Sequence, residues 1–261
     1  MKVDFHVHTN RSIDAVHSPR LMVKGAKKTG LDAIVITDHN RLFPKREAQH
    51  LTKEFGILVI PGIEGGNIAV QKHWIALGVE KQITMCRIDS ILSFIKNEGG
   101  LSIAPHPQAR LGYADYTELG FDAVESLNGC EPDSNQRVKN SSHIPEVGGS
   151  DAHALPMLGY TWTRINADAT VESILEAVRK GWCRPGGSTI PFFELIRFYP
   201  QYITHRILRE PLAAYAAARK VIREIRMVKI GESSSTAVEH NRFQGDQHSR
   251  RSIPVLPLDW R

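Results

Sequence analysis

The chain has 261 residues, of which 41% are hydrophobic and 23% charged, as is typical of a globular protein with its own core. Its three cysteines, Cys86, Cys130 and Cys183, form no CxxC pair, which excludes a disulfide-rich scaffold and predicts reduced thiols in a cytoplasmic protein. No apolar run approaches the roughly 18 residues of a membrane span, and the first residues lack a signal-peptide core. The net charge of +5 lies entirely in residues 190–261, because Lys+Arg and Asp+Glu balance over residues 1–189.

Predicted strands and helices alternate along most of the chain. Ser18 and Pro19 form a helix start, with Ser18 as N-cap and Pro19 at the first helical position, and Gly30 is a natural stop. Further helices are predicted at 44–55, at 88–98, and from a cap at Asp168 or Thr170 to about 180. Apolar or alternating runs predict strands at 2–7, 32–37, 57–63, 67–79 (a strand or a hairpin), 101–106, 122–128, 144–150 and 161–166.

This alternation predicts a parallel α/β fold, either a barrel or an open sheet. After residue 190 the composition changes. Residues 190–230 are predicted to form a basic helical extension with breaks at Pro200 and Pro211, and residues 231–261 a polar, disordered tail. The main domain is therefore predicted to span residues 1–189.

Metal-binding residue types recur at the ends of five predicted strands. In a parallel barrel or open sheet, the carboxyl ends of the strands converge on one face, so residues far apart in sequence can form a single site there. The residues at these ends are His6, His8, His39, Glu64, His106, Asp151 and His153.

The mixture of imidazoles and carboxylates, without cysteine, suits Zn, Mn or Fe better than Ca or soft metals. A carboxylate such as Glu64 can bridge two ions, which can share a hydroxide and bind phosphate oxygens. Each motif alone is weak, since HxH on a strand is often incidental and TDHN is compatible with a simple turn. The motifs together, in order and at equivalent strand ends, predict a metal cluster.

The segments DFHVHTN, TDHN, PGIE, APHP and GGSDAH resemble, in that order, the motifs of the PHP (polymerase and histidinol phosphatase) superfamily, over roughly residues 2–187. The resemblance implies a distorted (β/α)7 TIM-like barrel with two or three divalent ions at its C-terminal face. Matched by position, it implies the metal ligands His6, His8, Asp14, His39, Glu64, His106, Asp151 and His153. It also implies roles in catalysis for Glu64, Asp38 and His8.

Some members of that family use a ninth ligand between the APHP-like and GSDAH-like motifs. Here that stretch offers Glu125, Asn128, Cys130 and His143, none of which aligns, so the third metal site is left open. His73 is predicted to be a core histidine, or one that supports the ligands, rather than a ligand itself, and His17 a surface residue. Phosphate also requires cations, for which the candidates near the motifs are Arg110, Arg41 and Arg11.

The predicted function is hydrolysis of phosphate esters, most simply small phosphomonoesters such as nucleotides or sugar phosphates, by a metal-bridging hydroxide. Two alternatives stay open: a phosphodiesterase or nuclease, and a metal-binding interaction module without catalysis. Residues 192–209 interleave aromatics with arginine, a pattern compatible with a packed extension, a nucleic-acid-binding arm or attachment to an anionic membrane surface.

Overall fold

The computed structural model describes residues 1–66, 71–131, 144–196 and 200. The predicted basic extension beyond residue 200 and the polar tail lie outside the described residues, so the division into three segments stays a prediction. None of the helices in the described part is long and apolar enough to cross a membrane.

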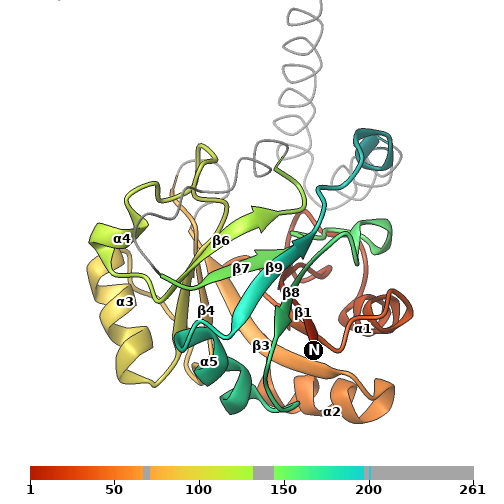
Figure 1. Ribbon diagram of the computed structural model, residues 1–261, viewed down its shortest axis with the longest axis horizontal. Coiled ribbons are helices and arrows are strands. Elements are labelled where there is room, and N and C mark those ends of the chain that lie inside the picture. Colours follow the sequence, from red (N-terminus) through yellow and green to blue (C-terminus); the bar gives the residue numbers. More distant parts are fainter. Residues whose placement is uncertain (67–70, 132–143, 197–199, 201–261) are drawn as a thin grey trace, which may run out of the picture. The chain divides into compact units, whose positions relative to one another are not determined.

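Nine strands form one sheet in the order β7-β6-β5-β4-β3-β2-β1-β8-β9 (Figure 1). The strands are β1 (Lys2–Val7), β2 (Ala33–Ile36), β3 (Leu58–Gly65), β4 (Trp74–Leu77), β5 (Leu101–Ala104), β6 (Ala123–Asn128), β7 (Glu146–Gly149), β8 (Thr161–Ile165) and β9 (Cys183–Gly187). The helices are α1 (Pro19–Lys28), α2 (Lys45–Phe55), α3 (Ile88–Asn97), α4 (Tyr116–Leu119), the 3-10 turn η2 (Leu155–Met157) and α5 (Val171–Arg179).

The sheet curls into a nearly closed barrel. Its two ends approach one another because β7 is tied to β1 and β8: the Ser150 N–H donates to Asp4 Oδ1 at 2.8 Å, and the Gly148 N–H donates to Thr163 Oγ1 at 2.7 Å. The predicted barrel-type α/β fold is therefore confirmed.

Seven strands, β1, β2, β3, β5, β6, β7 and β9, run in the same direction, while β4 and β8 run against their neighbours. The carboxyl ends of the seven strands therefore share one rim. Because β4 is antiparallel to both β3 and β5, its first residue lies at that same rim.

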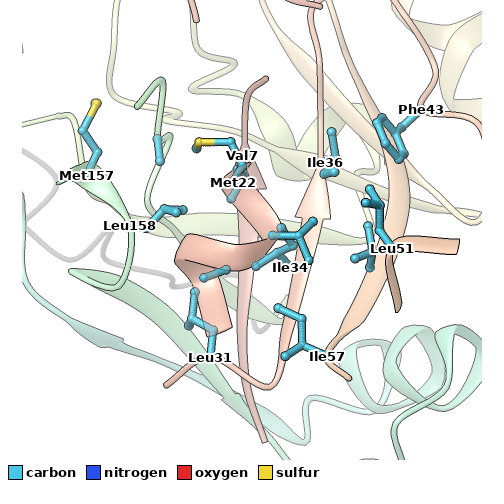
Figure 2. Packing of buried hydrophobic residues seen from close by; sticks show 14 of the residues in the cluster. Val7, Met22, Leu31, Ile34, Ile36, Phe43, Leu51, Ile57, Met157 and Leu158 are labelled. Atoms are coloured by element: carbon cyan, nitrogen blue, oxygen red, sulfur yellow. The ribbon is translucent and has the colours of Figure 1, made fainter. Parts of the chain in front are cut away.

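Alternate strand residues enter different hydrophobic clusters, as expected for strands buried on both faces. Ala33 and Val35 of β2 pack in the cluster that contains Val178 of α5, whereas Ile34 and Ile36 pack in the cluster that includes residues of α1 and α2. Figure 2 shows this second cluster, and Figure 1 shows α1 and α2 on one flank of the sheet with α3 and α4 on the opposite flank.

The predicted helix starts are confirmed. The Ser18 hydroxyl accepts the Leu21 N–H, and Thr170 Oγ1 accepts the Ser173 N–H, so each side chain satisfies a backbone donor that the first helical turn leaves unpaired. Gly30 follows α1 with φ +79°, a conformation that glycine adopts without steric cost.

Strand β9 was not predicted, because its sequence CRPGG contains proline and two glycines, which are rare in strands. It forms at the edge of the sheet, paired only with β8, where a missing N–H is tolerated. Gly186 is required there, since a Cβ would lie 2.6 Å from the Trp162 ring. Packing against Trp162 thus places glycine in this strand although glycine has a low strand propensity.

An irregularity in β1 changes which of its residues face into the barrel. The register of β1 against β2 shifts between Asp4 and Val7, so Phe5 packs in the cluster with β2's Val35 while Val7 packs in the cluster with Ile36. Such bulges change which residues of a strand face inward. The register of β6 against β7 also shifts, but only after Glu125, so Glu125 keeps the face of Ala123, which packs in the cluster with Phe5.

Candidate metal centre

The structure brings all eight predicted ligands together at the rim of the parallel strands. They come from β1 and the loop after it, from the ends of β2, β3 and β5, and from the loop after β7. Most are buried: His6, His8 and Glu64 are at most 1% exposed. Three groups of ligand-type atoms result, namely His6–His8–Asp151, His8–His39–His153 and Glu64–His73–His106.

The first group is the tightest. The Nε2 atoms of His6 and His8 are 3.0 Å apart, and Asp151 Oδ1 lies 3.4 Å from the first and 3.2 Å from the second. Glu64 Oε2 is 3.4 and 3.3 Å from the same two nitrogens. Four potential ligand atoms thus converge on one point.

Hydrogen bonds at the Nδ1 atoms of His6 and His8 fix the tautomers of these rings. His6 Nδ1 lies 3.1 Å from Glu125 Oε1, a carboxylate oxygen that can only accept, so His6 donates from Nδ1. The Ser12 hydroxyl donates to Asp38 at 2.9 Å, which leaves its oxygen to accept from His8 Nδ1 at 3.2 Å. Both rings therefore turn the lone pair of Nε2 toward the cluster.

This arrangement requires a cation. Two nitrogen lone pairs and two carboxylate oxygens face one another within 3.4 Å, and none of the four carries a hydrogen in these tautomers. Only a shared proton or a metal ion relieves their repulsion. Imidazoles held by a carboxylate or hydroxyl on the far nitrogen are the usual ligands of Zn and related ions, so these residues fit divalent metals.

The second group lies on the other side of His8. His39 Nε2 and His153 Nε2 are 3.3 and 3.6 Å from Asp14 Oδ2, and His39 Nδ1 is 3.0 Å from Glu64 Oε2. This last nitrogen is buried and, among the described residues, has no hydrogen-bond partner. His153 Nδ1 donates to the Asp151 carbonyl at 2.8 Å, and its Nε2 faces the Asp14 carboxylate.

The third group includes a residue that the sequence interpretation placed among core histidines. His73 Nδ1 and His106 Nε2 lie 3.0 and 3.2 Å from Glu64 Oε1. His73 precedes β4, and because β4 is antiparallel, this position belongs to the same rim as the strand ends. The structure thus supplies a third set of ligand-type atoms, without the candidates of the stretch 125–143.

Glu64 is the centre of the arrangement. Oε2 faces His6, His8 and His39, and Oε1 faces His73 and His106. Burial raises the pKa of this carboxyl, but the surrounding imidazoles outweigh burial and hold the pKa well below its usual value. In the same way burial lowers the pKa of His153, while Asp14 and Asp151 outweigh it and raise the pKa to about 10. The site therefore stabilises positive charge.

Asp38 contacts the segments that carry two of the ligands. It accepts the Thr9 N–H at 2.7 Å and the hydroxyls of Thr9 and Ser12 at 2.8 and 2.9 Å. Ser12 in turn accepts the His39 N–H at 2.9 Å. These contacts orient the segments that carry His8 and His39, which favours a positioning role for Asp38 over contact with substrate.

Glu125, named from the sequence only as a possible ninth ligand, is a hydrogen-bond partner of two candidate ligands. It is 2% exposed, and it accepts from His6 Nδ1, from the His106 N–H at 2.9 Å and from Asn128 Nδ2 at 2.8 Å. It thereby fixes the ring of His6 and the backbone of His106. It lies inside β6 on the same face as Ala123, which packs in the cluster that contains Phe5.

The change Glu125→Gln is expected to weaken metal binding by about 10- to 100-fold, since supporting partners of ligating histidines have effects of this size. An amide presents one acceptor oxygen instead of two, so it cannot serve both His6 and His106 as the carboxylate does. Calorimetric titration of the apoprotein with Mn or Zn measures this. Glu146→Gln, in which the altered residue accepts from Ser126 at 2.8 Å outside the cluster, is the control and should bind metal as the wild type does.

The remaining candidates for a ninth ligand have other partners. Asn128 Nδ2 lies 3.5 Å from Asp151 Oδ2, and the Cys130 thiol donates to the Asp151 carbonyl at 3.2 Å. Burial raises the pKa of the Cys130 thiol well above its usual value, which keeps it a donor. Both side chains hold the Asp151 segment in place, while His143 lies outside the described residues.

The three predicted substrate-binding arginines differ in their surroundings. Arg11 forms an ion pair with Glu47, and its guanidinium lies 4.9 Å from the centre of the Phe43 ring. Arg41 and Arg110 are exposed near the ends of the second and fourth motifs. Arg11 is thus held against α2. His17, predicted to lie at the surface, is half-buried, and its Nδ1 accepts the Leu155 N–H at 3.4 Å.

Backbone strain marks the same rim. Among the described non-glycine residues, positive φ occurs at Asn40, His106 and Asp151, with values of +54°, +30° and +53°. Two of these are candidate ligands and the third follows His39. Such conformations persist where surrounding contacts enforce them, and they cluster at functional sites.

The barrel and its rim of histidines and carboxylates define a protein with a candidate metal centre, and comparison with known proteins places it in a family. The PHP domain model matches residues 4–143, and a PHP-associated model matches residues 135–183. The chain belongs to the PHP domain family. The resemblance stated from the motifs is therefore confirmed.

Several relatives share parts of the chain. Protein MJ1587 of Methanocaldococcus jannaschii is 34% identical over 147 residues, which is 51% of this chain and 85% of that protein. A PolC-type DNA polymerase III of Lactococcus lactis is 44% identical over 64 residues, 24% of this chain and only 4% of the polymerase.

Two solved structures resemble the fold at identities too low to show more than the fold. One is a two-domain protein from Bacteroides vulgatus that contains a predicted PHP-like metal-dependent phosphoesterase, with a TM-score of 0.58 and 21% identity over 78% of this chain and 69% of that one. The other is endonuclease Q in complex with a duplex that carries an abasic lesion, with a TM-score of 0.52 and 15% identity over 76% and 66% of the two chains.

Proposed function

We propose that this protein is a metal-dependent phosphoesterase that hydrolyses small phosphomonoesters, such as nucleotides or sugar phosphates, with two or three Mn, Zn or Fe ions. The observation that carries the proposal is the position of Glu64, whose two oxygens face two separate sets of imidazoles. A carboxylate shared in this way suits a cluster of ions better than a single structural ion.

The ligand sets follow from the three groups. His6, His8 and Asp151 would hold one ion; Asp14, His39 and His153 a second; and His73 and His106 a third, with Glu64 shared among them. Divalent ions bound there would neutralise phosphate oxygens and lower the pKa of bound water. The chain's own contribution is orientation: Glu125, Ser12 and Asp38 hold the ligating rings, and Arg41 and Arg110 provide positive charge for the phosphate.

Metal analysis coupled to a panel of esters tests this proposal. Protein purified without added metal should contain about two or more divalent ions per chain by mass spectrometry, and it should cleave p-nitrophenyl phosphate. The panel also contains bis-p-nitrophenyl phosphate and single-stranded RNA. Preferred cleavage of either would assign the chain to phosphodiesterases or nucleases, the alternative that the fold it shares with endonuclease Q keeps open.

Two further results would contradict the proposal. Fewer than about one ion per chain, with no hydrolysis after Mn, Zn or Fe is supplied, would remove the metal centre from the mechanism. Full metal loading without turnover of any phosphate ester would favour the interaction module without catalysis.

A further inference from the structure

A row of three cations crosses the sheet on β1, β8 and β9. Lys2 of β1 lies opposite Arg164 of β8, which in turn lies opposite Arg184 of β9. Directly opposed residues of antiparallel strands point to the same face of a sheet, about 5 Å apart at the backbone. Like charges in such positions repel one another, so an anion bound across the row would stabilise it.

This row lies on the outer face of the barrel. On either side of Arg164, Thr163 and Ile165 turn inward: Thr163 exchanges hydrogen bonds with β7, and Ile165 packs in the hydrophobic cluster that includes residues of β1, β2 and α5. Because strand side chains alternate between two faces, Arg164 turns outward. Arg164 and Arg184 are exposed and Lys2 is half-buried. In Figure 1 no helix of the described residues crosses β8 and β9.

The three cations have no carboxylate partner among the described residues. Other exposed cations do, as when Arg87 pairs with Asp89 at 2.9 Å. Asp32, the carboxylate that contacts Lys2, accepts the backbone N–H of Lys2 at 2.7 Å and not its ammonium. The charge of the row is therefore available to an anionic partner.

Trp162 borders the row on one side. It lies two residues before Arg164 on the same face, and its indole lies flat on β9, where a Cβ at Gly186 would meet the ring at 2.6 Å. The ammonium of Lys2 and the guanidinium carbon of Arg164 lie 4.8 and 5.7 Å from the centre of the ring. The ring and two of the cations thus form one continuous surface.

Trp182 borders the row on the other side. It directly precedes β9, and its carbonyl accepts the Asn166 N–H at 3.1 Å, which continues the pairing with β8. Cys183 packs against the same inner cluster as Ile165, so Trp182 and Arg184 share the outer face. Trp182 is 54% exposed, and such large aromatic rings are typical of surfaces that bind a partner.

Flat rings among unpaired cations suit single-stranded nucleic acid, whose bases stack on aromatic side chains while basic side chains hold its phosphates. An anionic membrane would share the preference for positive charge, but attachment to it depends on apolar side chains that enter the lipid. The outward positions of β8 and β9 carry no aliphatic side chain, since they are occupied by Trp162, Arg164, Arg184 and Gly186. The Trp162 ring lies along the sheet and does not project from it.

We propose that this outer face of β1, β8 and β9 binds single-stranded nucleic acid. Lys2, Arg164 and Arg184 contact its phosphates. Trp162 and Trp182 stack with its bases.

The face is separate from the metal centre. β1 begins with Lys2 and carries the candidate ligand His6 near its other end. At a rise of about 3.3 Å per residue, the two residues are about 13 Å apart along the strand. The inference therefore goes beyond the proposed function and does not depend on it, because binding at this face requires neither a metal ion nor hydrolysis.

Fluorescence anisotropy of the metal-loaded full chain with a labelled DNA strand of mixed sequence tests the proposal. A length of about 12 nucleotides lies within the range of known single-strand sites. Phosphorothioate linkages keep the charge of the strand and resist cleavage at the metal centre. The affinity is measured over a series of salt concentrations and should fall as salt rises, since each phosphate contact releases counterions.

Loss of charge and loss of a ring should have different effects. Arg164→Gln combined with Arg184→Gln should weaken binding about tenfold or more and reduce the slope of log K against log salt by about 1.4, since each phosphate contact with a single strand contributes about 0.7. Trp182→Ala should weaken binding about fivefold or more, through lost stacking, and leave the slope unchanged. Arg46→Gln combined with Lys53→Gln removes two exposed cations from α2 and, as the matched control, should change neither quantity.

Absence of binding at low salt would overturn the proposal. So would affinities that the changes at β8 and β9 leave intact, or an equal loss in the α2 control, since binding would then depend on net charge alone. Flotation with vesicles of phosphatidylserine and phosphatidylcholine tests the other partner. Vesicle binding that Trp182→Ala abolishes, in a protein that does not bind the DNA strand, would assign the face to a membrane surface instead.

Discussion

Replacing Glu64 by glutamine is expected to lower kcat/KM for phosphate esters by about a thousandfold or more and to reduce the number of bound ions. The glutamine side chain has nearly the same shape but no charge. It presents one acceptor oxygen and an amide, so it cannot face His6 and His8 on one side and His73 on the other with acceptors alone. The expected loss therefore affects every ion that this carboxylate shares.

Metal analysis and steady-state kinetics of the same preparation measure this effect. The control is Glu98→Gln. Glu98 forms a surface ion pair with Lys81 at 2.8 Å, and it is not one of the candidate ligands. This variant should keep wild-type metal content and activity. Unchanged metal content in Glu64→Gln together with near-normal activity would show that the carboxylate bridges nothing, and the proposed cluster would have to be abandoned.

Most of the fold is predictable from local pattern because its elements have strong local signals. The buried runs at β2 and β3 contain almost only apolar residues, and helix starts such as those at Ser18 and Thr170 carry side chains that cap the first turn. The motifs at the strand ends likewise place eight side chains at one rim, because parallel strands share a direction. These features need no knowledge of distant contacts.

The direction of β4 could not be predicted in this way, and the proximity of His73 to Glu64 could not be predicted for that reason. An apolar strand looks the same whether it runs with or against its neighbours. In a fully parallel barrel, the residue before a strand would lie at the opposite end from the ligands. The antiparallel pairing of β4 with β3 and β5 reverses this and brings His73 to 3.0 Å from Glu64.

The role of Glu125 was hidden for a different reason. A carboxylate inside a strand normally indicates an exposed face, since strand side chains alternate between two faces. Glu125 shares the face of Ala123, which packs in the cluster that contains Phe5 and Val147, and Gly149 approaches its carboxylate closely: a Cβ there would lie 2.3 Å from Glu125 Oε1. Which face of β6 turns inward depends on packing across the sheet, and it has no signal in the local sequence.

Removal of the metal ions is expected to lower the melting temperature by roughly 10 °C. Ions that bind only the folded chain stabilise it by about 4 kcal/mol at a concentration about a thousand times Kd, and each kcal/mol shifts the melting temperature of a domain of this size by about 2–4 °C. The apoprotein must hold the acceptor nitrogens of His6 and His8 3.0 Å apart next to Asp151, a repulsion that only protons can then relieve.

Differential scanning calorimetry before and after dialysis against a strong chelator measures this shift, with residual metal checked by mass spectrometry. Asp151→Asn should show only a small difference between loaded and chelated protein, because it removes a charged oxygen from the tightest group of ligand atoms. Asp89→Asn, at a surface residue paired with Arg87, should retain the full difference. An identical melting temperature for loaded and fully stripped wild-type protein would contradict the metal centre, since four converging acceptors cannot bind a divalent ion without stabilising the rim that holds them.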